Sequence, residues 1–185
     1  YWPPLAALNL ISEFHALNED VHFSKNVYDI DHTVDYVFLS ISIVCSEFEL
    51  QTLKYLKNKF PKLRIFAFGS FVEFYKKELL KSGASVIIGE PEFLAQQIKL
   101  NSSNLNLVHA QGEIKIISND PDKLAPARWS KYVKANRNFI LGNFSSFAPI
   151  IATRGCPYSC FEYCTYPLQQ GRKVRQRDPK KIVNE

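Results

Sequence analysis

Apolar residues recur every three to four positions between residues 3 and 17, a spacing that predicts an amphipathic helix with prolines in its first turn. The run at 36–44 is almost entirely apolar and predicts a strand buried on both faces, as in parallel sheets. Apolar runs at 63–68 and 86–88 predict two further strands, and a short alternation at 21–24 predicts another. The long runs are separated by segments with helical spacing.

Three helices are expected between and after these strands. The first spans 46–60 and opens with Ser46 and Glu49 in a capping-box pattern. The second spans 71–81, where a following serine and glycine predict the stop, and the third runs on to about residue 99. Strand–helix alternation at this spacing predicts an α/β fold with a doubly wound parallel sheet, which binds ligands at the carboxyl ends of its strands.

The pattern changes after residue 100. Runs at 105–110 and 113–117 predict a hairpin, and 118–147 reads as a linker because it lacks periodicity. The apolar run 149–153 predicts the first strand of a second domain, and a later Asp-Pro pair predicts the N-cap and first position of a helix at 178–179. The expected organisation is an α/β domain at 1–100, a hairpin and linker at 101–147, and a second domain at 148–185.

The net charge of +5 arises in one segment. Residues 172–181 hold six basic residues and one acidic residue, so the rest of the chain is balanced at 17 of each sign. A basic segment can hold phosphate groups or RNA, but no aromatic residues are interleaved with these charges. A solvated connection, or a surface for another part of the protein, therefore explains the segment better, and a nucleic-acid partner is not expected.

No apolar run reaches the roughly 20 residues that a membrane-spanning helix needs. The low cysteine content, together with the candidate thiolate site described in the next paragraph, favours the reducing cytoplasm as the location of the protein. The chain has 185 residues, begins at Tyr1 and contains no methionine, so we expect it to be an internal piece of a longer protein.

Three of the four cysteines, Cys156, Cys160 and Cys164, fall within nine residues directly after the run 149–153. Cysteine thiolates hold iron–sulfur clusters, and a four-iron cluster held by only three of them keeps one iron free to bind something else. A zinc site would need a fourth ligand, and no histidine lies within forty residues of Cys156. Zinc and inert thiols stay open as alternatives. A structural disulfide is not favoured, because disulfides suit secreted chains and the remaining cysteine, Cys45, sits in an apolar strand.

The cysteine segment resembles the cluster loop of the radical S-adenosylmethionine (SAM) enzymes, which has the pattern CxxxCxxC and often an aromatic residue before the last cysteine. Tyr163 occupies that aromatic position. This chain reads CxxxCxxxC, with one additional residue between Cys160 and Cys164. The additional residue supplies up to about 3.5 Å of chain, which a loop can absorb as a bulge. In a helical turn it would rotate the third thiol by about 100°.

Flanking sequence narrows the resemblance to the cobalamin-dependent branch of that family. The segments 153–155, 165–167 and 171–175 look like the surroundings of this loop there, and residues 35–92 match best within the first domain. In that branch a flavodoxin-like domain binds cobalamin and precedes a barrel. The resemblance therefore implies a flavodoxin-like (Rossmann-like) parallel sheet followed by the truncated start of a (β/α) radical SAM barrel.

The resemblance also implies cofactors and roles. Cys156, Cys160 and Cys164 would hold a [4Fe–4S] cluster whose fourth iron chelates SAM, with Tyr163 against the adenine. An electron donor would reduce the cluster, SAM would be cleaved to a deoxyadenosyl radical, and cobalamin would deliver a methyl group in many members. The substrate would be a small or lipid-like molecule. This piece alone is not expected to turn over.

Small residues at strand ends mark the expected cobalamin site, because they let a flat corrin or its nucleotide tail approach the backbone. These residues are Ser40, Ser42, Gly69, Ser70, Gly89 and Glu90. The glycines also fit ordinary strand-to-helix turns. A histidine ligand to cobalt is not expected, since residues 20–22 match the cobalamin-binding motif DxHxxG only in part. Two other functions remain: a non-catalytic cobalamin or nucleotide module with a structural metal loop, and a degenerate homologue without a cluster.

Overall fold

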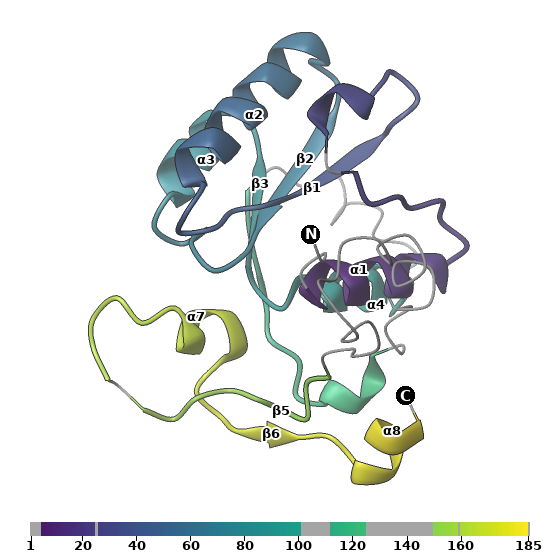
Figure 1. Ribbon diagram of the computed structural model, residues 1–185, viewed down its shortest axis with the longest axis vertical. Helices are drawn as coiled ribbons and strands as arrows, with labels where there is room; N and C mark the ends of the chain where they lie inside the picture. The colour runs from purple at the N-terminus through teal and green to yellow at the C-terminus, as the bar shows by residue number, and fades with distance from the viewer. Residues whose placement is uncertain (1–4, 25, 101–111, 125–149, 159, 185) are drawn as a thin grey trace, which may run out of the picture.

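A four-stranded parallel sheet is the centre of the molecule. The computed structural model describes residues 5–24, 26–100, 112–124, 150–158 and 160–184 (Figure 1). The strands lie side by side in the order β1 (Tyr36–Ser40), β2 (Arg64–Phe68), β3 (Ser85–Gly89) and β4 (Glu113–Ile116). All three strand pairs are parallel. The pairs of β1 with β2 and of β2 with β3 confirm the predicted parallel sheet, whereas β4 was expected in a hairpin.

Helices cover both faces of this sheet. They are α1 (Leu5–His15), α2 (Ser46–Lys59), α3 (Lys76–Lys81) and α4 (Leu94–Leu100), with short 3-10 turns at Val27–Asp29, Pro91–Phe93 and Pro121–Lys123. Figure 1 shows α2 and α3 on one face and α1 and α4 on the other. This arrangement confirms the mixed α/β fold and is consistent with a Rossmann-like sheet.

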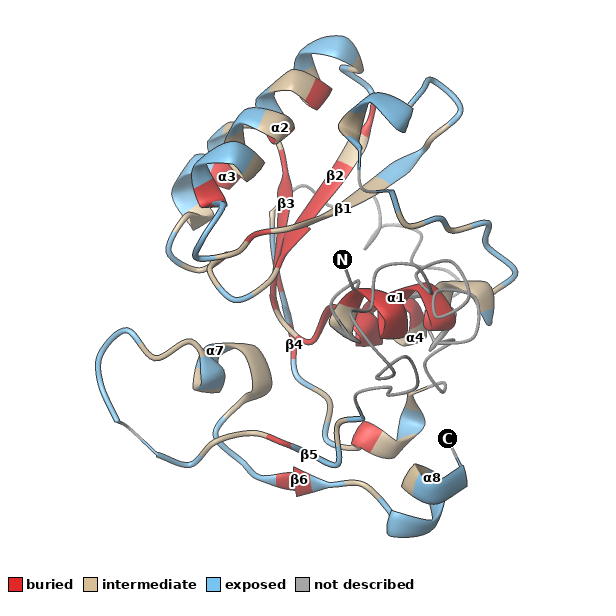
Figure 2. Cartoon of the chain, in the orientation of Figure 1, coloured by how far each residue is buried: buried red, intermediate tan, exposed pale blue. Residues whose placement is uncertain are grey.

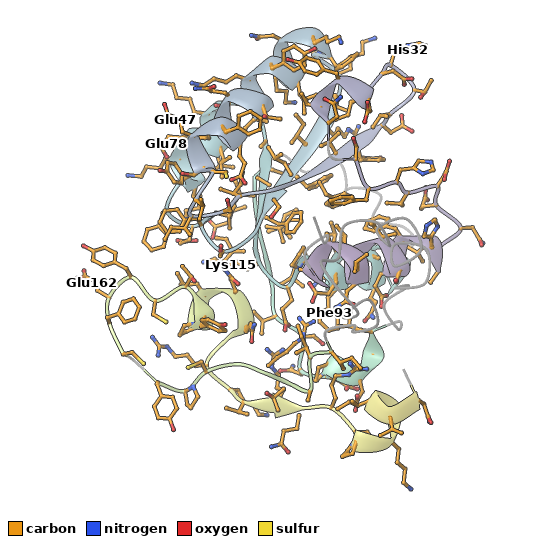
Figure 3. The ribbon with its side chains drawn as sticks, viewed as in Figure 1. His32, Glu47, Glu78, Phe93, Lys115 and Glu162 are labelled. Atoms are coloured by element: carbon orange, nitrogen blue, oxygen red, sulfur yellow. The ribbon has the colours of Figure 1, made fainter. Side chains whose placement is uncertain are left out.

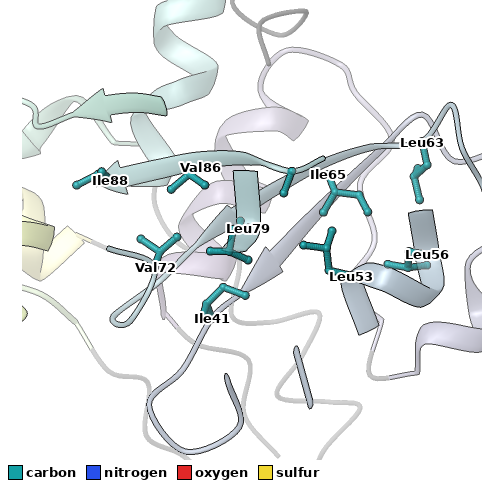
Figure 4. Close-up of a cluster of buried hydrophobic side chains, with 11 residues drawn as sticks. Ile41, Leu53, Leu56, Leu63, Ile65, Val72, Leu79, Val86 and Ile88 are labelled. Carbon is teal, nitrogen blue, oxygen red and sulfur yellow. The ribbon is translucent and has the colours of Figure 1, made fainter. Parts of the chain in front are cut away.

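Two apolar clusters hold the layers together. On the face of α2 and α3, Leu53, Leu56 and Leu79 are fully buried against alternate residues of β2 and β3 (Figure 4). On the opposite face the other residues of the same strands meet α1 and α4. Figure 2 shows the consequence, since β2 and β3 are almost wholly buried along their length.

Three predicted strands differ from the structure. Of the run at 149–153, the described residues 150–152 form no strand, and the observed strand, Thr153–Arg154, begins only at the end of the run. The run at 36–44 was expected to be buried on both faces, but β1 ends at Ser40 and is only half-buried, because among the described strands it pairs with β2 alone. Its apolar side chains still pack, as Phe38 stacks on Phe66 with ring centroids 5.2 Å apart. Residues 21–24 form no strand, since they pair with no other strand in the described part of the chain.

The helix ends are partly as predicted. Helix α2 begins at Ser46, but Ser46 does not cap it; Glu49 instead reaches back to Ser42, accepting hydrogen bonds from its backbone N–H (2.6 Å) and its hydroxyl (3.0 Å). The capping box was therefore wrong. Helix α3 is shorter than expected and begins at Lys76 after a series of turns, but it ends as predicted, before Gly83 at φ +83°.

The strand expected at 113–117 belongs to the sheet. As β4 it pairs in parallel with β3, with Val86 opposite Glu113. Its expected hairpin partner at 105–110 lies outside the described residues, as does most of the expected linker.

The chain from residue 150 onward forms a short antiparallel ribbon with two small helices. Its elements are β5 (Thr153–Arg154), α7 (Tyr166–Gln170), β6 (Arg175–Gln176) and α8 (Pro179–Asn184). The N-cap predicted before α8 is confirmed, because the Asp178 carboxylate accepts a hydrogen bond from the Lys180 N–H (2.9 Å). The start of a (β/α) barrel is not shown by these residues. No helix in the described ranges is long and apolar enough to cross a membrane.

Candidate metal-binding loop

The cysteine loop, residues 155–171, is closed at its base by backbone contacts. The Cys156 N–H donates to the Gly171 carbonyl (3.0 Å), and the Gly155 N–H donates to the Gln170 side chain (3.2 Å). Gly155 has φ +94°, and a Cβ there would lie 2.0 Å from the Lys173 carbonyl oxygen. A glycine is therefore required where the two sides of the loop meet.

The three predicted ligands occupy different parts of this loop. Cys156 lies at the base and is half-buried, Cys160 is exposed, and Cys164 is half-buried; all three are free thiols. The Cys164 N–H donates to the Phe161 carbonyl (3.2 Å), so the additional residue of the CxxxCxxxC spacing lies in a turn. Helix α7 begins only at Tyr166. The segment from Cys160 to Cys164 is therefore not helical, and the rotation of the third thiol that a helical turn would cause does not apply.

The donor type of this loop fits an iron–sulfur cluster better than a hard cation. Its candidate ligands are three thiols within reach of solvent, and thiolate is the ligand that iron–sulfur clusters use. Across the residues that the structure describes, no group of three or more His, Cys, Asp or Glu side chains is close enough together to hold a metal ion. The loop would have to draw its thiols together around a cluster.

The cysteine loop reaches the carboxyl edge of the sheet. The rings of Tyr163 and Phe74 are tilted against each other with centroids 6.3 Å apart, and Phe74 belongs to the connection between β2 and α3. Helix α7 contacts β3 near the same edge. Glu162 lies at the outer tip of the loop, away from its base (Figure 3). Tyr163 is 68% exposed, so one face of its ring is open to a ligand.

Four charged side chains are buried beneath the loop and form what we call the buried charge cluster. They are Glu90, Glu92, Arg154 and Arg175, each at most 5% exposed. Arg175 binds Glu90 through both terminal nitrogens (2.8 and 3.1 Å), and Arg154 binds the same carboxylate (3.1 Å) and also Glu92. The Ser118 N–H completes the shell of Glu90 (2.8 Å).

Glu92 is less well satisfied than Glu90. One of its carboxylate oxygens, Oε2, has no hydrogen-bond partner among the residues that the structure describes, although the side chain is fully buried. Burial raises the pKa of Glu92 above its usual value, and the neighbouring Arg154 guanidinium opposes that shift only in part.

Sequence reasoning placed only Glu90 of this cluster at a site. Arg154 and Arg175 are 64 and 85 residues away from Glu90 along the chain, and no periodicity links positions that far apart. The one available signal was that Arg154 lies directly before the cysteine loop. The arginines of segment 172–181 were read as solvated, whereas Arg175 is buried and Arg177 lies 3.6 Å from Asp122.

All six residues expected at the cobalamin site follow or end strands at the carboxyl edge of the sheet. They are Ser40, Ser42, Gly69, Ser70, Gly89 and Glu90. Ser40, which ends β1, is half-buried, and Ser70 is exposed.

Several of these six residues already contact other parts of the protein. A Cβ on Gly69 would lie 2.6 Å from the Ile41 carbonyl oxygen, and one on Gly89 would lie 2.0 Å from that of Ile116. Ser42 is bound by Glu49, and Glu90 by the two arginines of the buried charge cluster. Their use by cobalamin stays a prediction.

A comparison with models of known protein families found no match to this chain, and a comparison with curated proteins also found none.

Proposed function

We propose that this chain is the N-terminal part of a cobalamin-dependent radical SAM enzyme, with a flavodoxin-like domain and a [4Fe–4S] cluster on Cys156, Cys160 and Cys164. The observation that carries this proposal is the position of the cysteine loop. It meets the carboxyl edge of a parallel sheet, through the contact of Tyr163 with Phe74. A ligand bound at that edge and a cofactor bound in the loop would therefore be neighbours.

Each part of the loop has a role in this proposal. Cys156, fixed at the base, would provide an anchored thiolate. Cys160 is exposed and Cys164 is half-buried, and the loop that carries them would close around a cluster. Tyr163 offers an exposed aromatic face to adenine. A cluster bound there would supply the electron that cleaves SAM. The cobalamin site would use the loops after β1 and β2, where Ser70 is exposed.

Anaerobic reconstitution with iron and sulfide tests the cluster. We expect a brown protein with about four irons per chain. Cys160→Ala should lose most of this iron, whereas Cys45→Ala, which removes the exposed cysteine outside the loop, should bind as much as the unchanged chain.

Other outcomes favour the two alternative functions. Binding of zinc without iron would favour a structural metal loop, and a folded chain that binds neither metal would favour a degenerate homologue. A result in which Cys45→Ala loses as much iron as Cys160→Ala would contradict the assignment of the ligands.

Retention of hydroxocobalamin tests the other cofactor. We expect the chain to retain it on a desalting column, and Ser70→Trp to weaken that retention by placing a large ring at the carboxyl edge. The control is Lys62→Trp, an exposed position just before β2 at the opposite edge. Equal retention by both variants would place cobalamin elsewhere, and no retention by the unchanged chain would leave only the radical SAM half of the proposal.

A further inference from the structure

Glu90 contacts two parts of the molecule that lie far apart in the sequence. It directly follows β3, whereas its partners Arg154 and Arg175 lie opposite each other on β5 and β6. Its carboxylate is bound by both strands of the ribbon, at distances of 2.8 to 3.1 Å. The ribbon carries the cysteine loop, so one side chain fixes both ends of the loop to the sheet.

Further contacts restrict the two arginines. Arg175 also donates to the carbonyls of Gln170, at the end of the cysteine loop, and of Ser118. Arg154 lies over the ring of Phe93, with 5.9 Å between the guanidinium carbon and the ring centroid (Figure 3 labels Phe93). These arginines therefore have few alternative positions.

The charges of the cluster compensate one another only as a set. Two arginines face two carboxyl groups, and all four side chains are at least nine-tenths buried. A buried ion pair seldom adds net stability over apolar residues of the same size, but removing one partner leaves an uncompensated buried charge. Apolar side chains could fill the space of the buried charge cluster. The charged groups that fill it instead make directional contacts.

We propose that Glu90 is a positioning residue that, through Arg154 and Arg175, holds the cysteine loop against the carboxyl edge of the sheet. The significance of that placement for a cluster rests on the proposed function. The placement itself does not, because every contact that carries it is made by the protein alone.

Cross-linking in metal-free protein tests the placement. In a chain with all four cysteines replaced by serine, Phe74→Cys and Tyr163→Cys introduce one thiol on each side of the contact, and a short bis-maleimide joins them. We expect Glu90→Gln to slow cross-linking about tenfold or more, because two buried arginines then share a single carboxylate. Glu113→Gln, which removes a carboxylate from a surface pair with Lys76 and Lys115, should leave the rate unchanged.

A second variant distinguishes loss of the loop's placement from simple unfolding of Glu90→Gln. The double replacement Arg154→Met and Glu92→Met removes a balanced pair and fills its space, and such replacements are often neutral for stability. We expect this variant to melt like the unchanged chain while its cross-linking slows severalfold. Unchanged cross-linking in this folded variant and in Glu90→Gln would overturn the proposal.

Iron loading separates this proposal from the proposed function. With the native cysteines restored, we expect Glu90→Gln to bind a cluster with an altered electron paramagnetic resonance spectrum or lower iron content, and Glu113→Gln to match the unchanged chain. Slowed cross-linking in a chain that never binds iron would support the positioning role and remove the proposed function. A normal cluster and normal cross-linking in Glu90→Gln would overturn the positioning role alone.

Discussion

Gly89 shows how a single residue at the carboxyl edge serves the sheet itself. It has φ +111°, and the space where a Cβ would lie is occupied by the backbone of Ile116, the last residue of β4. The glycine therefore permits β3 and β4 to approach at the point where β3 ends.

Replacing Gly89 by alanine is expected to lower the free energy of unfolding by about 3 kcal/mol or more, because backbone strain and a clash add together. Gly112→Ala is the matched control, since Gly112 also has a positive φ, +144°, but no atom of the described residues lies within 4 Å of its Cβ position. Its cost should be limited to about 1 kcal/mol of strain. Equal losses in urea denaturation would show that contact with Ile116 is unimportant.

Glu92 gives a prediction about pH. Its pKa is raised by burial in the folded state, so its contribution to stability is fully present below the unfolded value of about 4.3 and is lost as the pH rises through the raised folded value. Gln cannot ionise. The free energy of unfolding of Glu92→Gln, measured relative to the unchanged chain, should therefore increase as the pH rises from about 4 toward 7. A difference that is independent of pH, or that falls, would contradict the raised pKa.

At the scale of elements, the strands and helices between residues 36 and 100 could be predicted because their periodicities are long and uninterrupted. The exposure of β1 could not be predicted, since an apolar run such as Tyr36–Ser40 can have the same composition in the middle of a sheet and at its edge. The capping of α2 was missed for a related reason. Ser42 and Glu49 are seven residues apart, beyond the spacing of the capping box.

The cysteine loop can be tested by shortening it. Deletion of Glu162, an exposed residue at the loop's outer tip, restores the CxxxCxxC spacing and removes no contact at the base (Figure 3). We expect a melting temperature within about 2 °C of that of the unchanged chain, and iron binding at least as high.

Deletion of Gln170 is the control for this experiment. It removes the side chain that binds Gly155 and the carbonyl that binds Arg175, so the melting temperature should fall clearly. If deleting Glu162 were as damaging as deleting Gln170, the division of the loop into a fixed base and an adaptable tip would be wrong.

At the scale of the whole molecule, Asp122 attaches the C-terminal segment to the α/β unit. Its carboxylate accepts a hydrogen bond from the Asp178 N–H (2.8 Å) and lies 3.6 Å from the Arg177 guanidinium. Its carbonyl accepts a hydrogen bond from Lys181 (3.3 Å).

Asp122→Ala should therefore speed hydrogen exchange in α8 about tenfold or more, while exchange in β2 and β3 stays unchanged. Hydrogen–deuterium exchange with mass spectrometry measures both in one experiment. Faster exchange in β2 and β3 as well would show that Asp122 supports the sheet rather than the attachment of α8.

The candidate site was predictable only where its residues are neighbours in sequence. Cys156, Cys160 and Cys164 were found by their spacing, and the structure adds that the loop carrying them meets the carboxyl edge. The pairing of Glu90 with Arg154 and Arg175 was not predictable, because it depends on how two distant segments pack.

This pairing limits how the two halves of the protein can be recombined. A chimera that joined the sheet of one homologue to the cysteine loop of another would enclose unmatched charges unless both carboxylates and both guanidinium groups came from compatible parents. Recombination points chosen within the linker alone would then yield mostly misassembled proteins, and the successful hybrids would be those that exchange Glu90, Glu92, Arg154 and Arg175 together.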